Sequence, residues 1–219
     1  MSKTLIVNWK ANPTTLEEAQ ELFDFYLVEI SKYQNVQLVV CPPFVYLEEL
    51  AKQLQTTNYK LQTSLGAQDI FWEKAGPFTG EISTPHLFEN GFRQGSQNLS
   101  QKGAGSTQML RNFGVDHVLV GHSDRRYTIG ETDEMINKKI KAALDSNIVP
   151  VLLVGEKNKG EDKRTVLEQQ LSADLAGLTA EQIAKVLITY EPVWAISTQP
   201  GAEPDTPENT LEAIKIIRE

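Results

Sequence analysis

The sequence predicts an α/β fold built on a parallel sheet, and two observations support this prediction. Short, almost uninterrupted apolar runs recur along the 219 residues, as is typical of parallel strands that helices cover. Between these runs lie segments in which apolar residues recur with helical spacing. This regular alternation indicates an α/β protein with six strand–helix units, if a weaker third strand is counted.

Six segments are expected to form strands, and the continuous runs among them are expected to be buried on both faces. Half-exposed antiparallel strands would instead alternate between apolar and polar residues. In chain order, the expected strands span residues 4–9, 36–41, 59–66, 117–121, 148–154 and 186–190.

Five segments are expected to form helices, and the last of them has the best-defined start. Thr206 can cap its first turn, Pro207 suits the first helical position, and Glu208 lies near the positive end of the helix dipole. The first helix is expected to follow Thr14 and Thr15. The five expected helices span residues 16–30, 44–54, 135–144, 164–175 and 207–217.

The composition narrows the possible partners and locations. A hydrophobic fraction of 40% and a charged fraction of 23% are ordinary for a soluble protein. A net charge of -8 argues against nucleic acid as a partner and means that an anionic substrate needs local positive charge. No apolar run approaches the ~20 residues that span a bilayer, so no membrane partner is expected. The lone Cys41 fits a reducing compartment, and we predict a cytoplasmic protein.

The stretch 84–106 differs from the rest of the chain. It is rich in Gln, Asn, Gly and Ser and has no steady period, so a surface loop is expected. Residues 95–99 echo residues 66–70, and in each copy a Lys and then a Gly follow. The echo indicates an imperfect local duplication that inserts a second loop, although chance agreement is an open alternative.

Polar residues follow three of the expected strands abruptly, at the end where parallel folds place their sites. Asn8 and Lys10 follow the first strand, His122 follows the fourth and Glu191 follows the sixth. Each alone has a simpler explanation: a solvated lysine, a hydrogen-bonded histidine or a charge at the rim of the sheet. Together they provide a cation, an electrophile and a base, which enolisation of a phosphorylated carbonyl compound requires.

These residues lie in stretches that resemble the triosephosphate isomerase family, in the same order and on the corresponding strands. The resemblance covers the whole chain apart from 84–106. It implies a TIM (β/α)8 barrel, of which about six units are present, in a single domain over residues 1–219 that is incomplete at the C-terminus. The similar stretches are residues 8–10, 79–83, 121–126, 155–156 and 190–196.

The resemblance also implies roles for the polar residues. Glu191 would be the base that moves a proton between C1 and C2, and His122 the neutral electrophile hydrogen-bonded to the substrate oxygens. Lys10 would offset the charge of the phosphate and the enediolate, and Asn8 would orient the substrate. Residues 192–201, called the lid below, would close over the phosphate, to which Ser197 would offer its backbone N–H.

Supporting residues, assembly and pathway follow from the same resemblance. Ser123, Asp124 and Arg126 would support the catalytic residues or lie at a subunit interface. The family implies a small phosphorylated triose as substrate, a homodimer, a place in glycolysis and gluconeogenesis, and no metal or organic cofactor. The stretch 84–106 falls where the third loop of the family docks into its partner subunit.

The chain departs from the family pattern in places. Asp124 stands where glutamate is usual, Leu153 stands where cysteine is usual, and Ser197 and Gln199 replace two glycines of the lid, which residues 200–204 lengthen. The seventh and eighth units, with their glycine-rich phosphate loops, are not expected within the 219 residues.

Three hypotheses about function follow from this comparison. The leading hypothesis is a triosephosphate isomerase acting through Glu191 and His122. The alternative is a non-catalytic, truncated chain that lacks the phosphate-binding loops. A third, weaker hypothesis is another barrel isomerase acting on a phosphorylated sugar, against which the similarity of residues 190–196 to one family argues.

Overall fold

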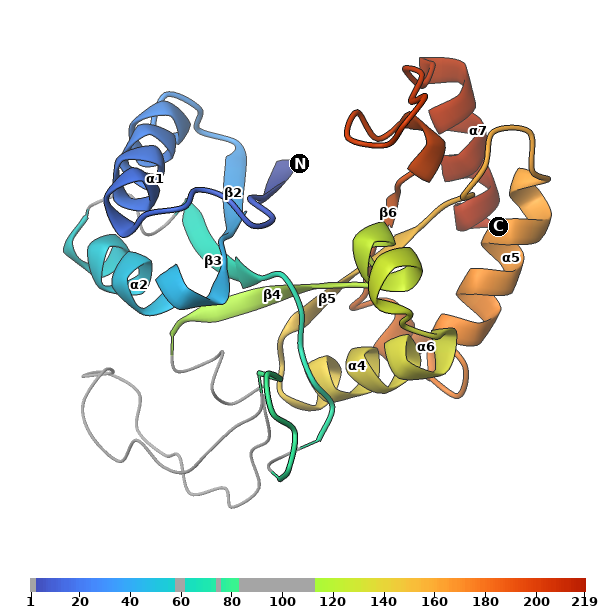
Figure 1. Ribbon diagram of the computed structural model, residues 1–219, viewed down its shortest axis with the longest axis horizontal. Coiled ribbons are helices and arrows are strands. Elements are labelled where there is room, and N and C mark those ends of the chain that lie inside the picture. The colour runs from blue at the N-terminus through green and yellow to red at the C-terminus, as the bar shows by residue number, and fades with distance from the viewer. Residues whose placement is uncertain (1–2, 58–61, 74–75, 83–112) are drawn as a thin grey trace. The chain divides into compact units, whose positions relative to one another are not determined.

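The computed structural model describes residues 3–57, 62–73, 76–82 and 113–219 (Figure 1). The chain divides into two compact units. The first comprises Met1–Val118 with Asp145–Ile148, and the second comprises Leu119–Leu144 with Val149–Glu219. The stretch 84–106, with its apparent duplication, lies outside the described residues.

The first unit is built on parallel strands that pair in chain order. Strand β1 pairs with β2, β2 with β3, and β3 with the first part of β4, with a register shift between Leu65 and Gly66. Helices α1 and α2 alternate with the strands along the chain (Figure 1). The bounds are β1 (Lys3–Asn8), α1 (Leu16–Ile30), β2 (Val36–Cys41), the 3-10 turn η1 (Phe44–Tyr46), α2 (Leu47–Thr56), β3 (Thr63–Ala67) and β4 (Val115–Val120).

The second unit repeats the alternation of strand and helix. Strands β5 and β6 are parallel, with Val154 opposite Tyr190 at their carboxyl ends. Two short turns, the π-helix η2 and the 3-10 turn η3, follow β4 and β6. The bounds are η2 (Asp124–Ile129), α4 (Asp133–Asp145), β5 (Val149–Val154), α5 (Lys163–Asp174), α6 (Ala180–Ile183), β6 (Leu187–Tyr190), η3 (Val193–Ala195) and α7 (Pro207–Arg218).

Local sequence explains where several helices begin. The hydroxyl of Thr15 accepts from the backbone N–H of Glu18 at 3.2 Å, which satisfies one of the free donors at the start of α1. Thr206 does the same for Asn209 at 3.2 Å, and Pro207 occupies the first turn of α7. Asp162 caps α5 by accepting from Thr165 at 2.7 Å. The cap expected at Thr206 is therefore confirmed, and α1 begins after Thr15 as expected.

The expected α/β fold of parallel strand–helix units is confirmed, with differences in detail. The third strand begins later than expected, at Thr63, and the expected helix 44–54 divides into η1 and α2. The turns η2 and η3 and the short helix α6 have too few residues for a periodic pattern, and the sequence analysis did not identify them. A single barrel domain over residues 1–219 stays a prediction.

Burial on both faces was a wrong prediction for β1 and β6. Leu5 on β1 is 51% exposed and Leu187 on β6 is 41% exposed. Among the described residues each of these strands pairs along one edge only, so part of its side-chain surface stays uncovered. The inner strands behave as expected, since Val40, Leu65 and Leu152 are at most 1% exposed.

No helix in the described part of the chain has both the length and the apolar character needed to cross a bilayer.

Cys41 ends β2 in the core of the first unit. It is fully buried, and a side chain at Gly66 on the neighbouring strand would collide with its Sγ. Burial, and secondarily the negative charge of Asp116, raise the pKa of the Cys41 thiol to about 12. The thiol is therefore protonated and packed, which disfavours a nucleophilic role.

We expect Cys41 in the folded chain to resist iodoacetamide, because the reagent needs an exposed thiolate. At neutral pH the raised pKa alone reduces the thiolate fraction by about a thousandfold. Mass spectrometry after timed alkylation measures the rate, and the chain in denaturant is the control. Because Cys41 is the only cysteine of the sequence, each modified chain reports this site. Equal rates in the folded and denatured chain would contradict the burial described.

Candidate active site

The first unit contributes Asn8 and Lys10 at the carboxyl end of β1. Lys10 has a φ of 53°, in the left-handed region that a side chain with a Cβ rarely adopts. Three hydrogen bonds hold this region: Lys10 N to Asn8 Oδ1 at 2.9 Å, Gln68 Nε2 to Lys10 O at 2.6 Å, and Gln68 Nε2 to Cys41 O at 3.0 Å. A strained backbone held by its surroundings is typical of functional sites.

Gln68 was not identified as a site residue from the sequence. It follows β3 directly, much as Lys10 follows β1 after Asn8 has ended that strand, and this position was an available signal. Its side chain joins the ends of three neighbouring strands, because it follows one strand and bonds to carbonyls that follow or end the other two. Gln68 therefore fixes the place where Lys10 leaves the sheet.

The second unit brings His122 and Glu191 together. Nε2 of His122 lies 3.5 Å from Oε1 of Glu191. His122 is 5% exposed and follows β4, and Glu191 follows β6. Two residues from different strands thus place a histidine ring nitrogen beside a carboxylate at the same edge of this unit.

Asp124 determines which ring nitrogen of neutral His122 carries the proton. The backbone N–H of Asp124 donates to Nδ1 of His122 at 3.1 Å. Nδ1 must then be unprotonated, so a neutral ring carries its proton on Nε2. The Asp124 carboxylate lies 3.5 Å from the same Nδ1. His122 is therefore arranged to act as a hydrogen-bond donor through Nε2.

The backbone of Glu191 is held against the carboxyl end of β5. Its N–H donates to Val154 O at 2.8 Å. A Cβ at Gly155 would collide with the Glu191 carbonyl and lie 3.1 Å from Pro192 N, so only glycine fits there. Gln170 in α5 bonds both backbone groups of Gly155, at 2.9 and 3.2 Å. These contacts fix the position of the Glu191 backbone relative to the carboxyl end of β5.

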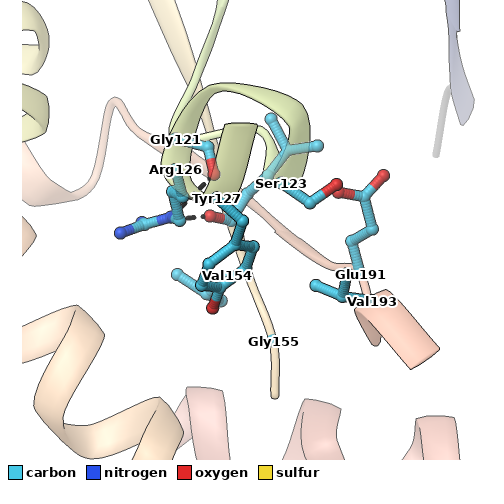
Figure 2. A pocket seen from close by; sticks show the side chains of 9 residues that line it. Gly121, Ser123, Arg126, Tyr127, Val154, Gly155, Glu191 and Val193 are labelled. Carbon is cyan, nitrogen blue, oxygen red and sulfur yellow. Dashed lines mark hydrogen bonds between the residues drawn. The ribbon is translucent and has the colours of Figure 1, made fainter. Parts of the chain in front are cut away.

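Arg126 links the loop that carries His122 to the same carboxyl end of β5. This loop, residues 121–126, is called the histidine loop below. Its Nε donates to Gly121 O at 2.7 Å, and its guanidinium also donates to Leu153 O at 3.3 Å (Figure 2). The same guanidinium pairs with Asp133 at 2.6 Å and with the fully buried Asp174 at 2.5 Å. Burial raises the pKa of Asp174 to about 7, while Arg126 opposes this shift.

Arg126, Ser123 and Glu191 line one pocket of the second unit (Figure 2). Ser123 Oγ is buried, and within the described part of the chain it has no hydrogen-bond partner. A buried hydroxyl of this kind normally finds a partner. The pocket is lined by Gly121, Ser123, Arg126, Tyr127, Leu153, Val154, Gly155, Glu191 and Val193.

A second buried cluster consists of charged side chains and connects η2 to α4. Arg125 pairs with Glu131 at 2.5 Å, and Lys139 pairs with the same carboxylate. The side chains of Glu131 and Lys139 are each 1% exposed. Buried charges persist only when they are paired, so this cluster constrains how η2 leads into α4. This cluster was not predicted from the sequence.

Glu156 anchors the start of the lid. Its Oε1 accepts from the Tyr190 hydroxyl at 2.7 Å and from Trp194 Nε1 at 3.2 Å. Its backbone oxygen accepts from Val193 N at 3.0 Å. Burial, together with the hydrogen bond to Glu156, raises the pKa of the Tyr190 phenol, so this group remains a donor. Residues 155–156 resemble the family pattern in sequence, but that resemblance implied no role for Glu156.

The predicted site residues therefore fall into two groups. Ser123, Asp124, Arg126 and the pair His122–Glu191 belong to the second unit, whereas Asn8 and Lys10 belong to the first. Ser197 lies in the lid with its side chain exposed. In the part of the chain that the structure describes, no three His, Cys, Asp or Glu residues are grouped to hold a metal ion.

Comparison with known proteins adds an independent observation. A family model described as triosephosphate isomerase matches residues 3–96 and 88–219, and the two matches overlap inside the stretch 84–106. Triosephosphate isomerase of Aquifex aeolicus (strain VF5) is 38% identical over 221 residues, covering 100% of this chain and 76% of that protein.

Further relatives agree with this match. The triosephosphate isomerase of Clostridium beijerinckii (strain ATCC 51743 / NCIMB 8052) is 36% identical over 99% of this chain and 77% of that protein. That of Caldanaerobacter subterraneus subsp. tengcongensis is 39% identical over 96% of this chain and 73% of that protein. The chain therefore belongs to the triosephosphate isomerase family, a family of isomerases.

Proposed function

We propose that the chain interconverts dihydroxyacetone phosphate and D-glyceraldehyde 3-phosphate through an enediolate, with Glu191 as base and His122 as electrophile. The observation that supports this proposal most directly is the distance of 3.5 Å between Glu191 Oε1 and His122 Nε2. A base and an electrophile that act on adjacent substrate atoms must lie this close to each other.

The proposed reaction moves one proton between two carbons. The Glu191 carboxylate takes a proton from C1 of dihydroxyacetone phosphate, and the electrons of the C–H bond form the enediolate. The Nε2–H of His122 donates to the carbonyl oxygen as negative charge develops there. Glu191 then returns the proton to C2, and the proton of the C1 hydroxyl passes to the C2 oxygen, so that the aldehyde forms without net loss of atoms.

The remaining site residues bind and position the substrate in this proposal. Lys10 supplies the local positive charge that an anionic substrate needs on a chain of net charge -8. Asn8 orients the substrate, and Ser197 offers its backbone N–H to the phosphate. Asp124 and Arg126 hold His122 and its loop in place through the contacts described above, and Ser123 lines the adjoining pocket.

The setting of the reaction is part of the proposal. Family membership supports a place in glycolysis and gluconeogenesis, a cytoplasmic location and a homodimer. A reaction that begins and ends on a phosphorylated triose requires neither an oxidant nor a reductant. A small phosphorylated triose is therefore the only substrate needed.

We expect Glu191→Gln to lower kcat by about 10²–10⁴-fold, the usual contribution of a positioned general base. Glutamine keeps the shape of the side chain but cannot accept the proton. The measurement is triose-phosphate turnover of the purified chain, together with deuterium exchange from solvent into the substrate. Glu21→Gln, at an exposed position of α1, is the matched control. Absence of both turnover and exchange in the unmodified chain would instead support the non-catalytic alternative.

We expect Gly155→Ala to lower kcat by about tenfold to a hundredfold, because the added methyl group displaces the backbone of Glu191. Overpacking should also destabilise the chain by about 1–3 kcal/mol. Gly160→Ala is the control for kcat: its φ of 90° makes alanine destabilising there too, but the added Cβ meets no atom within 4 Å and leaves Glu191 in place. Steady-state kinetics and urea unfolding measure the two effects. A Gly155→Ala chain with normal kcat would show that this contact does not position the base.

A further inference from the structure

We propose that Asn209 is a positioning residue that ties the two ends of the lid to each other. The proposal rests on the proposed function only for its catalytic consequence, since the lid can be observed without substrate. Asn209 lies in the first turn of α7, beyond the lid in the sequence. No role for this residue follows from the motifs of the chain.

All polar groups of the Asn209 side chain are engaged. Its Nδ2 donates to the Tyr190 hydroxyl at 3.2 Å and to Asp205 Oδ1 at 2.7 Å. Its Oδ1 accepts from Lys163 Nζ at 2.6 Å. Rotating the amide by half a turn would place its oxygen against the Asp205 carboxylate and its NH₂ group against an ammonium. The amide therefore has a single acceptable orientation.

At the first end of the lid, Asn209 reaches Tyr190, the residue before Glu191. The Tyr190 hydroxyl accepts from Asn209 and donates to Glu156, whose carboxylate also accepts from Trp194 in η3. Hydrogen bonds thus run in one direction from the Lys163 ammonium through Asn209 and Tyr190 to the Glu156 carboxylate. Charged groups at both ends strengthen such a chain.

At the second end of the lid, which from here on includes the lengthening residues 200–204, Asn209 reaches Asp205. Asp205 also accepts from Thr206 N at 2.8 Å and from Thr210 Oγ1 at 2.7 Å. Thr206 in turn caps α7. Asp205 is therefore bound to the first turn of a helix, and the Asn209 amide connects that turn to Tyr190. Both ends of the lid are joined through one side chain.

Much of the bonding of the lid is internal. The backbone N–H groups of Ala195, Ile196, Gln199 and Ala202 donate to the carbonyls of Pro192, Val193, Ile196 and Gln199, respectively. A segment bonded within itself and fixed at both ends moves as a flap about those ends. Without Asn209 the distance between the ends is less restricted, and a smaller fraction of molecules holds the lid in a competent position.

The test is Asn209→Leu, followed by amide hydrogen exchange with mass spectrometry of peptides. Loss of a hydrogen bond of ordinary strength should raise lid exchange by about two- to tenfold. Exchange in α5 beyond its first turn, which contains Lys163, should not change. Asn209→Gln, which keeps the amide, should restore part of the protection. The informative amides are those of Val193, Ala195, Ile196, Gln199, Ala202 and Glu203, all of which are hydrogen-bonded.

Asn158→Leu is the matched control. This substitution removes an amide–carboxylate hydrogen bond of 2.6 Å to Glu161, in the loop after β5. That hydrogen bond does not join the ends of the lid. Unchanged lid exchange in Asn209→Leu, or an equal rise in the lid and in α5, would overturn the proposal. If Asn209→Leu does not fold, Tyr190→Phe removes the hydroxyl in the middle of the same series of hydrogen bonds. It should give the same local rise in amide exchange of the lid.

Catalysis provides the second readout. In an active chain, Asn209→Leu should lower kcat/KM for the phosphorylated triose by more than for unphosphorylated glyceraldehyde, because only the phosphate needs the lid. Equal losses for both substrates would contradict a role through the lid. A chain without isomerase activity would refute the proposed function but leave the exchange result in force, so the two failures are distinguishable.

Discussion

The second unit depends on the carboxyl end of β5, against which two separate segments are held: the histidine loop and the segment that runs from Glu191 into the lid. Arg126, in the histidine loop, donates to Leu153 O of β5. The backbone N–H of Glu191, just after β6, donates to Val154 O of β5. Gly155 lies so close to the Glu191–Pro192 peptide that no side chain fits between them. Glu156 then bonds the start of the lid. The 3.5 Å separation of His122 and Glu191 follows from this shared support.

Fixed polar groups, more than net charge, determine what the site can do. A backbone N–H assigns the proton of His122 to Nε2, and a tyrosine whose pKa is raised remains a donor to Glu156. Buried Asp174 and Glu131 are each paired with a cation. Such groups are oriented before substrate arrives, so little reorganisation is needed as charge develops in the reaction. The chain as a whole carries a charge of -8, and attraction of an anion must be local.

Much of the fold was predictable because it depends on neighbours in the sequence. Apolar runs located β2 and β5 to within one residue, and the cap at Thr206 was visible as a single hydroxyl side chain before a proline. The exposure of Leu5 and Leu187 was not predictable from their runs, since an apolar pattern does not state which strands have two neighbours. Short turns such as η2 span too few residues for a period to show.

The sequence by itself determined the order of strands and helices and singled out His122, Glu191, Asn8 and Lys10 as site candidates, because these follow from local patterns and from motifs in register. The structural roles of four other polar residues became apparent only in the tertiary structure: Gln68, Gln170, Glu156 and Asn209. Each of these polar side chains acts through partners on other elements of its own unit. The physical reason is that a hydrogen bond depends on distance and direction, and a polar residue in a sequence specifies neither until the chain has folded.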